Sequence, residues 1–269
     1  MEIKSIKKSY KAKAKEIKKH TKSEIKASKE ERRKALSELH DNKLSDIRAA
    51  VVKRGKRAPV DPPRRPLLEE IGNSVTHGIG SLFSMAALAL MIIYSSDALE
   101  FVGAIVYFVG LFAMFTMSCL YHAFPHGSVV KRLFRRFDYS GIYLLIGATF
   151  APILLSYIGG VFGIVFFAVQ WAVIITGVTF IGVFGPTRLR WLHTPLYIVL
   201  GWCGIMFMPR MLANDPWFVF YILGGGIIYS LGMIPFRMKT KIAHFIWHFF
   251  VLGGAVLQWV GVFIFVYLS

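Results

Sequence analysis

Four titratable side chains stand inside or beside apolar runs of this chain. His244 and His248 lie four residues apart in "AHFIWHFFVL", His122 ends an earlier apolar run, and Asp138 begins the next one. Removing an ionisable group from water is costly unless the group is paired, hydrogen-bonded or bound to a metal. These four residues are therefore the first candidates for a functional site.

The spacing of the histidines indicates metal chemistry. Residues four apart on a helix share a face, so His244 and His248 could reach one ion together. With His122 as a third ligand, the set has the composition of a catalytic zinc site, which keeps a fourth position open and acidifies a bound water to a pKa of about 7. Asp138 would then hydrogen-bond that water or a ligating histidine. Ser118 lies four residues before His122, on the same helix face.

Other polar residues near the apolar runs have simpler interpretations. Asn73 and His77 are again four apart, in "EEIGNSVTHGIG", and we expect them to pack against a neighbouring helix or to support the histidine site. Taken singly, His126 and His193 are interpreted as polar anchors near a membrane interface. The carboxylates at positions 69 and 70 precede the apolar run and are interpreted as surface groups without a functional role.

The composition excludes an ordinary soluble domain. Hydrophobic residues make up 55% of the 269 residues, charged residues 17%, and the mean hydropathy is +0.53. A bilayer core of about 30 Å needs about 20 apolar residues in a helix. The sequence predicts an all-α bundle of seven transmembrane helices within residues 67–269, and no cleavable secretory signal. The predicted spans are 71–94, 100–122, 138–158, 160–184, 192–209, 216–235 and 243–267.

The charge is concentrated before the first span. Residues 1–66 hold 22 Lys and Arg against 9 Asp and Glu, within a formal net charge of +17 for the whole chain. We predict a basic helical arm over 1–56 and a proline-rich linker over 57–66. Lys and Arg also dominate the short connections at 131–136, 188–190 and 237–241, which predicts a cytoplasmic N-terminus and an outside C-terminus.

The arm predicts a membrane partner rather than a nucleic acid. Its charge would hold it against an anionic inner leaflet, at about 1 kcal/mol for each basic residue close to the surface. Nucleic-acid binding is not expected, because Tyr10 is the arm's only aromatic residue and no binding motif is present. Sparse apolar residues, among them Ile3, Ile6 and Ile17, follow a rough heptad spacing.

Four segments together resemble a known family. "EEIGNSVTHGIG", "SCLYHAF", "RFDYSGIYLLIGATFAP" and "HFIWHFFVLGG" are similar, in order and spacing, to the signature segments of the bacterial hemolysin III family. That family is related to the adiponectin and progestin receptors and, more distantly, to alkaline ceramidases. The resemblance implies a multi-pass protein of the bacterial plasma membrane, with zinc near the cytoplasmic face. The implied ligands are His122, His244 and His248, and Asp138 and Ser118 match the companion positions.

Three functions are compatible with these features. The favoured one is a zinc-dependent hydrolase that cleaves an amide or ester bond of a lipid with an activated water. In that hypothesis Asp138 orients or deprotonates the water, and Ser118 stabilises the developing oxyanion. The alternatives are a receptor-like membrane sensor with structural zinc and a cytolytic, pore-forming hemolysin.

Overall fold

The computed structural model describes residues 2–53, 61–238 and 240–269, and these residues form helices joined by short connections. No strand occurs among them. The chain divides into two units, an arm up to residue 60 and a bundle over Asp61–Ser269. Residues 57–60 of the predicted linker lie outside the described residues, and residues 61–66 are irregular.

The arm contains one long helix, α1 (Glu2–Lys53). Lys, Glu and Ala are strong helix formers and dominate its sequence, whereas Gly and Pro are absent from it. The 52 residues span about 78 Å at the rise of an α-helix. Five apolar side chains of α1 are exposed: Ile17, Ile25, Leu36, Leu39 and Ile47.

The bundle contains seven helices that are long and apolar enough to cross a membrane, which confirms the predicted fold class. Three of the spans change helix type near one end or in the middle, and the π-helical extension of α4 follows Pro152, which lacks a backbone N–H. The elements are α2 (Leu67–Ile93), α3 (Ala98–Ala123), α4 (Val129–Pro152) with η1 (Ile153–Ile158), α5 (Gly160–Phe184), α6 (Arg190–Trp202) with η2 (Cys203–Phe207) and α7 (Met208–Asn214), α8 (Pro216–Arg237), and α9 (Ala243–Val262) with η3 (Phe263–Tyr267).

Helix α4 begins nine residues earlier than the predicted span at 138. The Ser128 side chain accepts a hydrogen bond from the backbone N–H of Lys131, at 3.0 Å, and so caps a helix that starts at Val129. The hydropathy pattern did not predict residues 129–137 as part of the span, because this segment is rich in Lys and Arg. Asp138 consequently lies within α4 rather than at its beginning.

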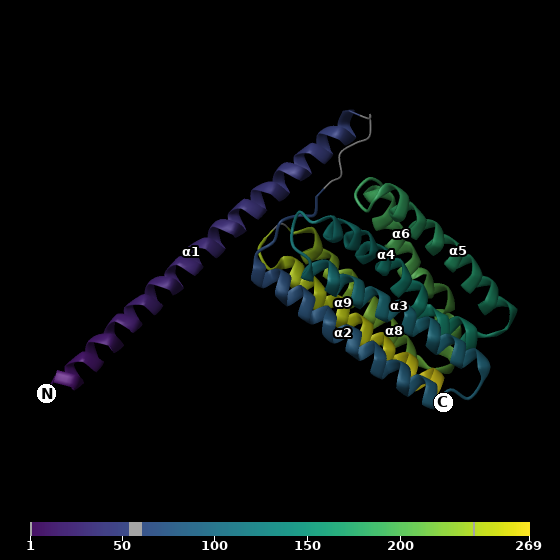
Figure 1. The fold of residues 1–269 in the computed structure, drawn as a ribbon. Coiled ribbons are helices and arrows are strands. Elements are labelled where there is room, and N and C mark those ends of the chain that lie inside the picture. Colours follow the sequence, from purple (N-terminus) through teal and green to yellow (C-terminus); the bar gives the residue numbers. More distant parts are fainter. Residues whose placement is uncertain (1, 54–60, 239) are drawn as a thin grey trace. The chain divides into compact units, whose positions relative to one another are not determined.

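The first and last spans pack side by side, so the bundle closes on itself (Figure 1). Helix α4 with η1 lies inside the bundle. In the most apolar 18-residue stretch of this span 72% of the residues are buried, against 44% or less in every other span. Helices α5 and α6 stand on the side of α4 away from α2 (Figure 1). Because successive spans alternate in direction, the starts of α2, α4 and α9 meet the end of α3 at one end of the bundle.

Glycines allow α3 and α4 to approach closely. A Cβ atom at Gly110 would overlap the Cβ of Ala148, and one at Gly141 would lie 2.9 Å from the Cα of Met114. Small residues at such contacts are typical of packed membrane helices. The close packing fixes the end of α3, which carries His122, beside the start of α4.

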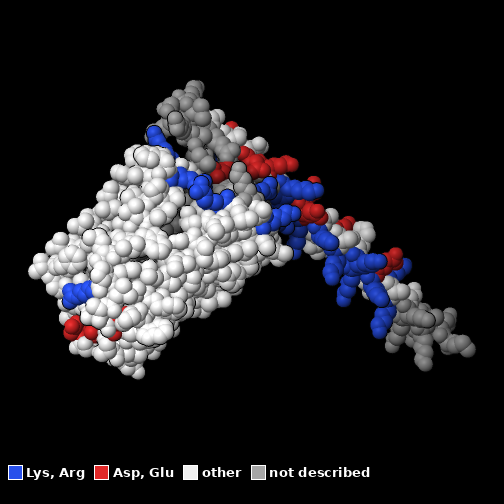
Figure 2. Space-filling view, turned by 180° about the vertical axis from the view of Figure 1, so that it is seen from behind, with Lys and Arg blue, Asp and Glu red and all other residues white. Residues whose placement is uncertain are grey.

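On one face of the bundle, the charged side chains of the described residues lie near the two ends (Figure 2). Figure 2 shows a broad flank without Lys, Arg, Asp or Glu, with basic residues near one end and a small mixed group near the other. Such a band is expected of a surface that faces lipid.

Candidate metal centre

Three histidines from two helices meet at this end of the bundle. His122 lies in the last turn of α3, and His244 and His248 lie in the first turns of α9. One ligand atom from each ring lies within 4.8 Å of the others, and the ring centroids are 4.8–5.2 Å apart. His122 and His248 are buried and His244 is half-buried. The structure thus brings together the predicted ligand set, and this group could hold a metal ion.

Hydrogen bonds at Nδ1 leave the other ring nitrogen, Nε2, of His122 and His248 available to a metal. Nδ1 of His122 donates to the Glu70 carboxylate at 2.6 Å, and Nδ1 of His248 donates to the Asn73 carbonyl at 3.2 Å. Nε2 of His122 and Nε2 of His244 are buried, and within the described part of the chain they have no hydrogen-bond partner. A neutral imidazole that donates through one nitrogen presents the other as a ligand, so the donor set fits a metal.

Glu70 belongs to the site, contrary to its interpretation as a surface group. Its second carboxylate oxygen lies 3.0 Å from Nζ of Lys131, which is 1% exposed. Lys131 also donates to the carbonyls of Tyr121 and Phe124 at the end of α3, at 2.9 and 3.0 Å. The Glu70–Lys131 pair therefore joins the starts of α2 and α4 to the turn that carries His122. Helical periodicity contains a signal for this, because Glu70, Asn73 and His77 share a face of α2.

Glu69 links α2 to the start of α9. Its carboxylate accepts a hydrogen bond from the backbone N–H of Ile242 at 3.4 Å and pairs with Arg65 at 3.4 Å. Ile242 has a φ of 63°, in the left-handed region that β-branched residues rarely adopt. This strained residue immediately precedes α9, two positions before His244.

Asn73 and His77 both contact ligand candidates. The side-chain amide nitrogen of Asn73 lies 3.3 Å from Nδ1 of His122. The ring of His77 stacks on His248 with a centroid separation of 3.8 Å and an interplanar angle of 21°. Both residues are fully buried. Their positions agree with the expected supporting role, which stays a prediction.

Ser118 and Asp138 line a small cavity together with His244 and His248. Its volume is about 30 Å³, which is enough for a water molecule. Ser118 is buried and Asp138 is half-buried. The two companion residues therefore face the space beside the histidines, as a role in chemistry at that point requires.

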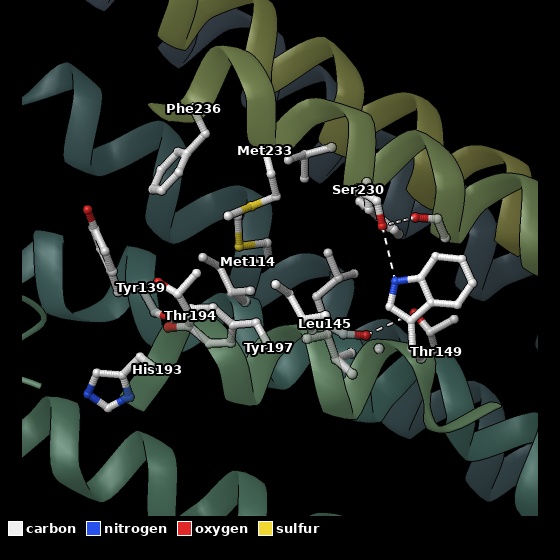
Figure 3. Close-up of a pocket in the computed structure, with 18 of the residues that line it drawn as sticks. Met114, Tyr139, Leu145, Thr149, His193, Thr194, Tyr197, Ser230, Met233 and Phe236 are labelled. Carbon is white, nitrogen blue, oxygen red and sulfur yellow. Dashed lines mark hydrogen bonds between the residues drawn. The ribbon is translucent and has the colours of Figure 1, made fainter. Parts of the chain in front are cut away.

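A larger cavity of about 130 Å³ adjoins the small one. Met114, Ile142 and Trp247 are among the residues that line both. Figure 3 shows Met114, Leu145 and Met233 projecting toward one another from surrounding helices. His193 lies on one side of these apolar side chains and Ser230 on the other (Figure 3).

This larger cavity reaches the surface of the bundle between α6 and α8. Gly201 and Ser230, both exposed, form part of its lining. The indole N–H of Trp202 on α6 donates to the hydroxyl of Ser230 on α8 at 3.1 Å (Figure 3). One side-chain hydrogen bond therefore crosses the mouth of an apolar cavity.

The two remaining histidines of the bundle lie outside the cluster. Nε2 of His126 lies 3.0 Å from the Pro62 carbonyl. His193 is buried, and its Nδ1 lies 2.9 Å from the Tyr143 hydroxyl. His193 is thus an internal residue rather than an interface anchor, because packing of α4 against α6 covers it.

Comparisons with known proteins agree with this architecture. A family model described as "Haemolysin-III related" matches residues 66–259. Hemolysin-3 of Bacillus cereus is 39% identical over 195 residues, which cover 71% of this chain and 88% of that protein. The Hemolysin-3 homolog of Bacillus subtilis (strain 168) is 35% identical over 192 residues, covering 70% and 89%.

A weaker similarity extends to a human protein. The monocyte to macrophage differentiation factor, of the adiponectin and progestin receptor family, is 26% identical over 221 residues, covering 79% of this chain and 91% of that protein. The histidine cluster lies within the matched family region, and α1 lies outside it. The chain belongs to the haemolysin-III-related family of multi-pass membrane proteins.

Proposed function

We propose that this protein is a zinc-dependent hydrolase that cleaves an amide or ester bond of a membrane lipid at the histidine cluster. The observation that carries the proposal is that two neighbouring cavities share part of their lining. The small one holds His244, His248, Ser118 and Asp138, and the larger apolar one reaches the lipid-facing surface. A lipid could place its chain in the second and its polar linkage in the first.

Zinc is the metal that the donor set favours. Three imidazole ligands with a fourth position open are typical of catalytic zinc. When bound, zinc would acidify a water molecule and polarise the carbonyl group under attack. The hydrogen bonds from His122 to Glu70 and from His248 to Asn73 use Nδ1 and fix the two rings, which leaves Nε2 of each as the atom that could bind zinc.

The remaining roles follow from position. Asp138 faces the small cavity as a carboxylate that can orient water and accept its proton. Ser118 can donate its hydroxyl hydrogen to the carbonyl oxygen as negative charge develops there. The apolar walls of the larger cavity would exclude water from the chain and restrict its orientation, which lowers the entropic cost of the reaction.

The proposed setting is the plasma membrane of a bacterium, with the arm and the histidine cluster on the cytoplasmic side. The basic connections at 131–136, 188–190 and 237–241 support this orientation, because Lys and Arg concentrate on the cytoplasmic side. The similarity to two Bacillus proteins supports the proposal that the membrane is bacterial. The arm would meet an anionic inner leaflet, whose charge complements its own.

Metal content is the first test. The full chain, purified in detergent without chelators, should contain about one zinc per chain by mass spectrometry. His248→Ala should abolish binding, and His126→Ala is the matched control because His126 lies outside the cluster. Metal-free wild-type protein that also fails to take up added zinc would exclude a zinc enzyme.

Hydrolysis is tested separately. Purified protein is incubated with lipid amides and lipid esters in mixed micelles, and released fatty acid is measured. Asp138→Asn should keep its zinc but lose release by at least about a hundredfold, as expected for a general base. A zinc-loaded wild type without turnover on any of these lipids would reject the hydrolase.

A receptor-like sensor with structural zinc is the second candidate. The histidines and their partners join α2, α3, α4 and α9, so a metal could hold these helices in one arrangement. In that case zinc removal should lower the thermal midpoint sharply while no lipid is cleaved. Cytolysis, suggested by the name of the Bacillus relatives, is tested by leakage from dye-loaded vesicles.

A further inference from the structure

Apolar residues of α1 recur every eleven residues. Ala14, Ile25, Leu36 and Ile47 form one series, and Ile17 and Leu39 belong to a second series three positions later, in which Ser28 is polar. Eleven residues make three helical turns of about 3.67 residues each, so each series stays near one face of the helix and drifts only slowly round it, as in a right-handed supercoil. The rough heptad spacing near the N-terminus is thus part of an eleven-residue repeat. We call these two adjacent series the apolar stripe.

The apolar stripe is exposed within the arm. Ile17, Ile25, Leu36 and Leu39 are between 52% and 67% exposed. An isolated helix stabilised only by propensity has no reason to maintain such a stripe over three repeats. A narrow stripe of two apolar rows is the form found at the seam of coiled coils, whereas a helix packed on a globular core has a wider apolar face.

The two sides of the stripe carry opposite charges. Lys18, Lys22, Lys29 and Arg33 follow one edge. Glu24, Glu31 and Asp46 lie on the other edge, which also holds Lys13 near its N-terminal end. Lys18 and Lys29, and Lys22 and Arg33, are eleven residues apart, and Glu24 and Asp46 are twenty-two apart, so these charges keep to their edges along the helix. The arrangement identifies a partner surface that offers apolar groups between an acidic and a basic edge.

We propose that the apolar stripe of α1 pairs with α1 of a second copy of this chain, parallel and in register. A twofold axis along the helices places the basic edge of one copy against the acidic edge of the other. Glu24 then faces Lys29 of the second copy, at the five-residue offset typical of parallel coiled coils. An antiparallel pair would place like edges together and is disfavoured.

A lipid surface satisfies the stripe less well than a second copy does. An anionic leaflet would attract the basic edge but repel Glu24, Glu31 and Asp46 on the other edge. Helices that lie in the interface also carry a broader apolar face with large side chains. In the paired arrangement Lys15, Lys19 and Lys26 lie outside the seam, where they can still contact the leaflet.

Disulfide crosslinking of the full chain in proteoliposomes tests the pairing. Cys119 and Cys203 are first replaced by Ala, and single cysteines are introduced as Ile17→Cys or Ile47→Cys. A disulfide needs Cα atoms within about 7 Å, so mild oxidation should give covalent dimers at both positions. Ser23→Cys and Ser45→Cys, on the opposite face of α1, are the controls and should crosslink several-fold less.

The register is tested by charge. Glu24→Lys and Lys29→Glu should each reduce crosslinking at Ile17→Cys, and the double variant should restore it. An antiparallel pair would not bring residue 17 to itself, so absence of crosslinks at both stripe positions overturns the proposal. A blue shift of a dye on Ile17→Cys that requires anionic vesicles, without crosslinking, would instead identify lipid as the occupant. Neither outcome depends on the metal centre, which lies in the other unit.

Discussion

The two sides of the bundle are built differently. Around the histidines, α2, α3, α4 and α9 are joined by buried ion pairs and hydrogen bonds, and the α3 and α4 backbones nearly touch. Around the larger cavity, α8 and the span that begins with α6 are only 28% and 22% buried in their most apolar stretches. We call these the metal side and the cavity side.

This difference matches the two physical demands of the proposed reaction. A metal ion is bound well only if its ligands keep a fixed geometry, which requires helices that cannot move independently. A lipid chain has many conformations and must enter from the bilayer, which requires space and weakly joined helices. The metal side should therefore respond strongly to small changes in packing or charge, and the cavity side weakly.

The largest effect is expected from Lys131→Met on the metal side. Lys131 neutralises the Glu70 carboxylate in a buried position. Removing the cation leaves an uncompensated buried charge, which should cost about 3–5 kcal/mol of unfolding free energy. Equilibrium unfolding in mixed detergent measures this, and Lys241→Met on an exposed connection is the control.

A double variant separates charge from shape. Lys131→Met combined with Glu70→Gln removes both charges and should recover part of the loss, while zinc affinity falls by about 10–100-fold because His122 loses its carboxylate partner. If the double variant is as unstable as Lys131→Met alone, the capping of the α3 carbonyls by Lys131, rather than the ion pair, is the main contribution.

Two glycine substitutions compare the sides directly. Gly110→Ala places a methyl group against Ala148 and should destabilise the bundle by about 1–3 kcal/mol. Gly226→Ala, on α8 beside the cavity, meets nothing within 4 Å and should stabilise it by about 0.4–1 kcal/mol. Both are measured by the same unfolding assay. Equal destabilisation by both would remove the distinction between the sides.

The sequence was sufficient for the fold class and for the ligand candidates. Seven apolar runs predict seven helices because the bilayer imposes a minimum length on each. The i, i+4 spacing places His244 and His248 on one face, and alternation of the spans brings the end of α3 to the same level. These are local patterns, and they need no knowledge of which helices touch.

Glu70 and Lys131 could not be placed in the same way. A charged residue at the edge of an apolar run usually marks the membrane surface, and both residues lie at such edges. Their burial depends on contacts between α2, α3 and α4, and those contacts follow from glycine packing elsewhere. The cavities have no sequence signal either, since they arise where bulky side chains from several helices fail to fill the space.

A smaller effect is expected where the cavity opens. Ser230→Ala removes the hydrogen bond from Trp202 across α6 and α8. Such a bond contributes about 1 kcal/mol, which corresponds to roughly a fivefold faster entry of a fluorescent acyl probe in stopped-flow binding. Thr179→Val on α5 is the control, because Thr179 bonds only its own helix in the described structure. Slower entry would show that the probe takes another route.

The smallest effect concerns Ile242, the strained residue before α9. Its left-handed backbone costs about 1–2 kcal/mol for a residue with a Cβ. Glycine removes this strain, but its more flexible unfolded chain costs about 0.5–1 kcal/mol in return. Ile242→Gly should therefore raise the unfolding free energy by about 1 kcal/mol or less, whereas Ile242→Ala, which keeps the Cβ, should not.

The zinc affinity of Ile242→Gly shows whether the strained backbone at this residue helps to position α9. The hydrogen bond from the Ile242 N–H to Glu69 does not involve the side chain, so it should survive in glycine and keep His244 in place. Unchanged affinity would mean that the metal side is held by its ion pairs and tolerates the strain. A weaker site in a more stable protein would mean that the rigid turn itself positions α9, and that rigidity on this side is maintained at the expense of stability.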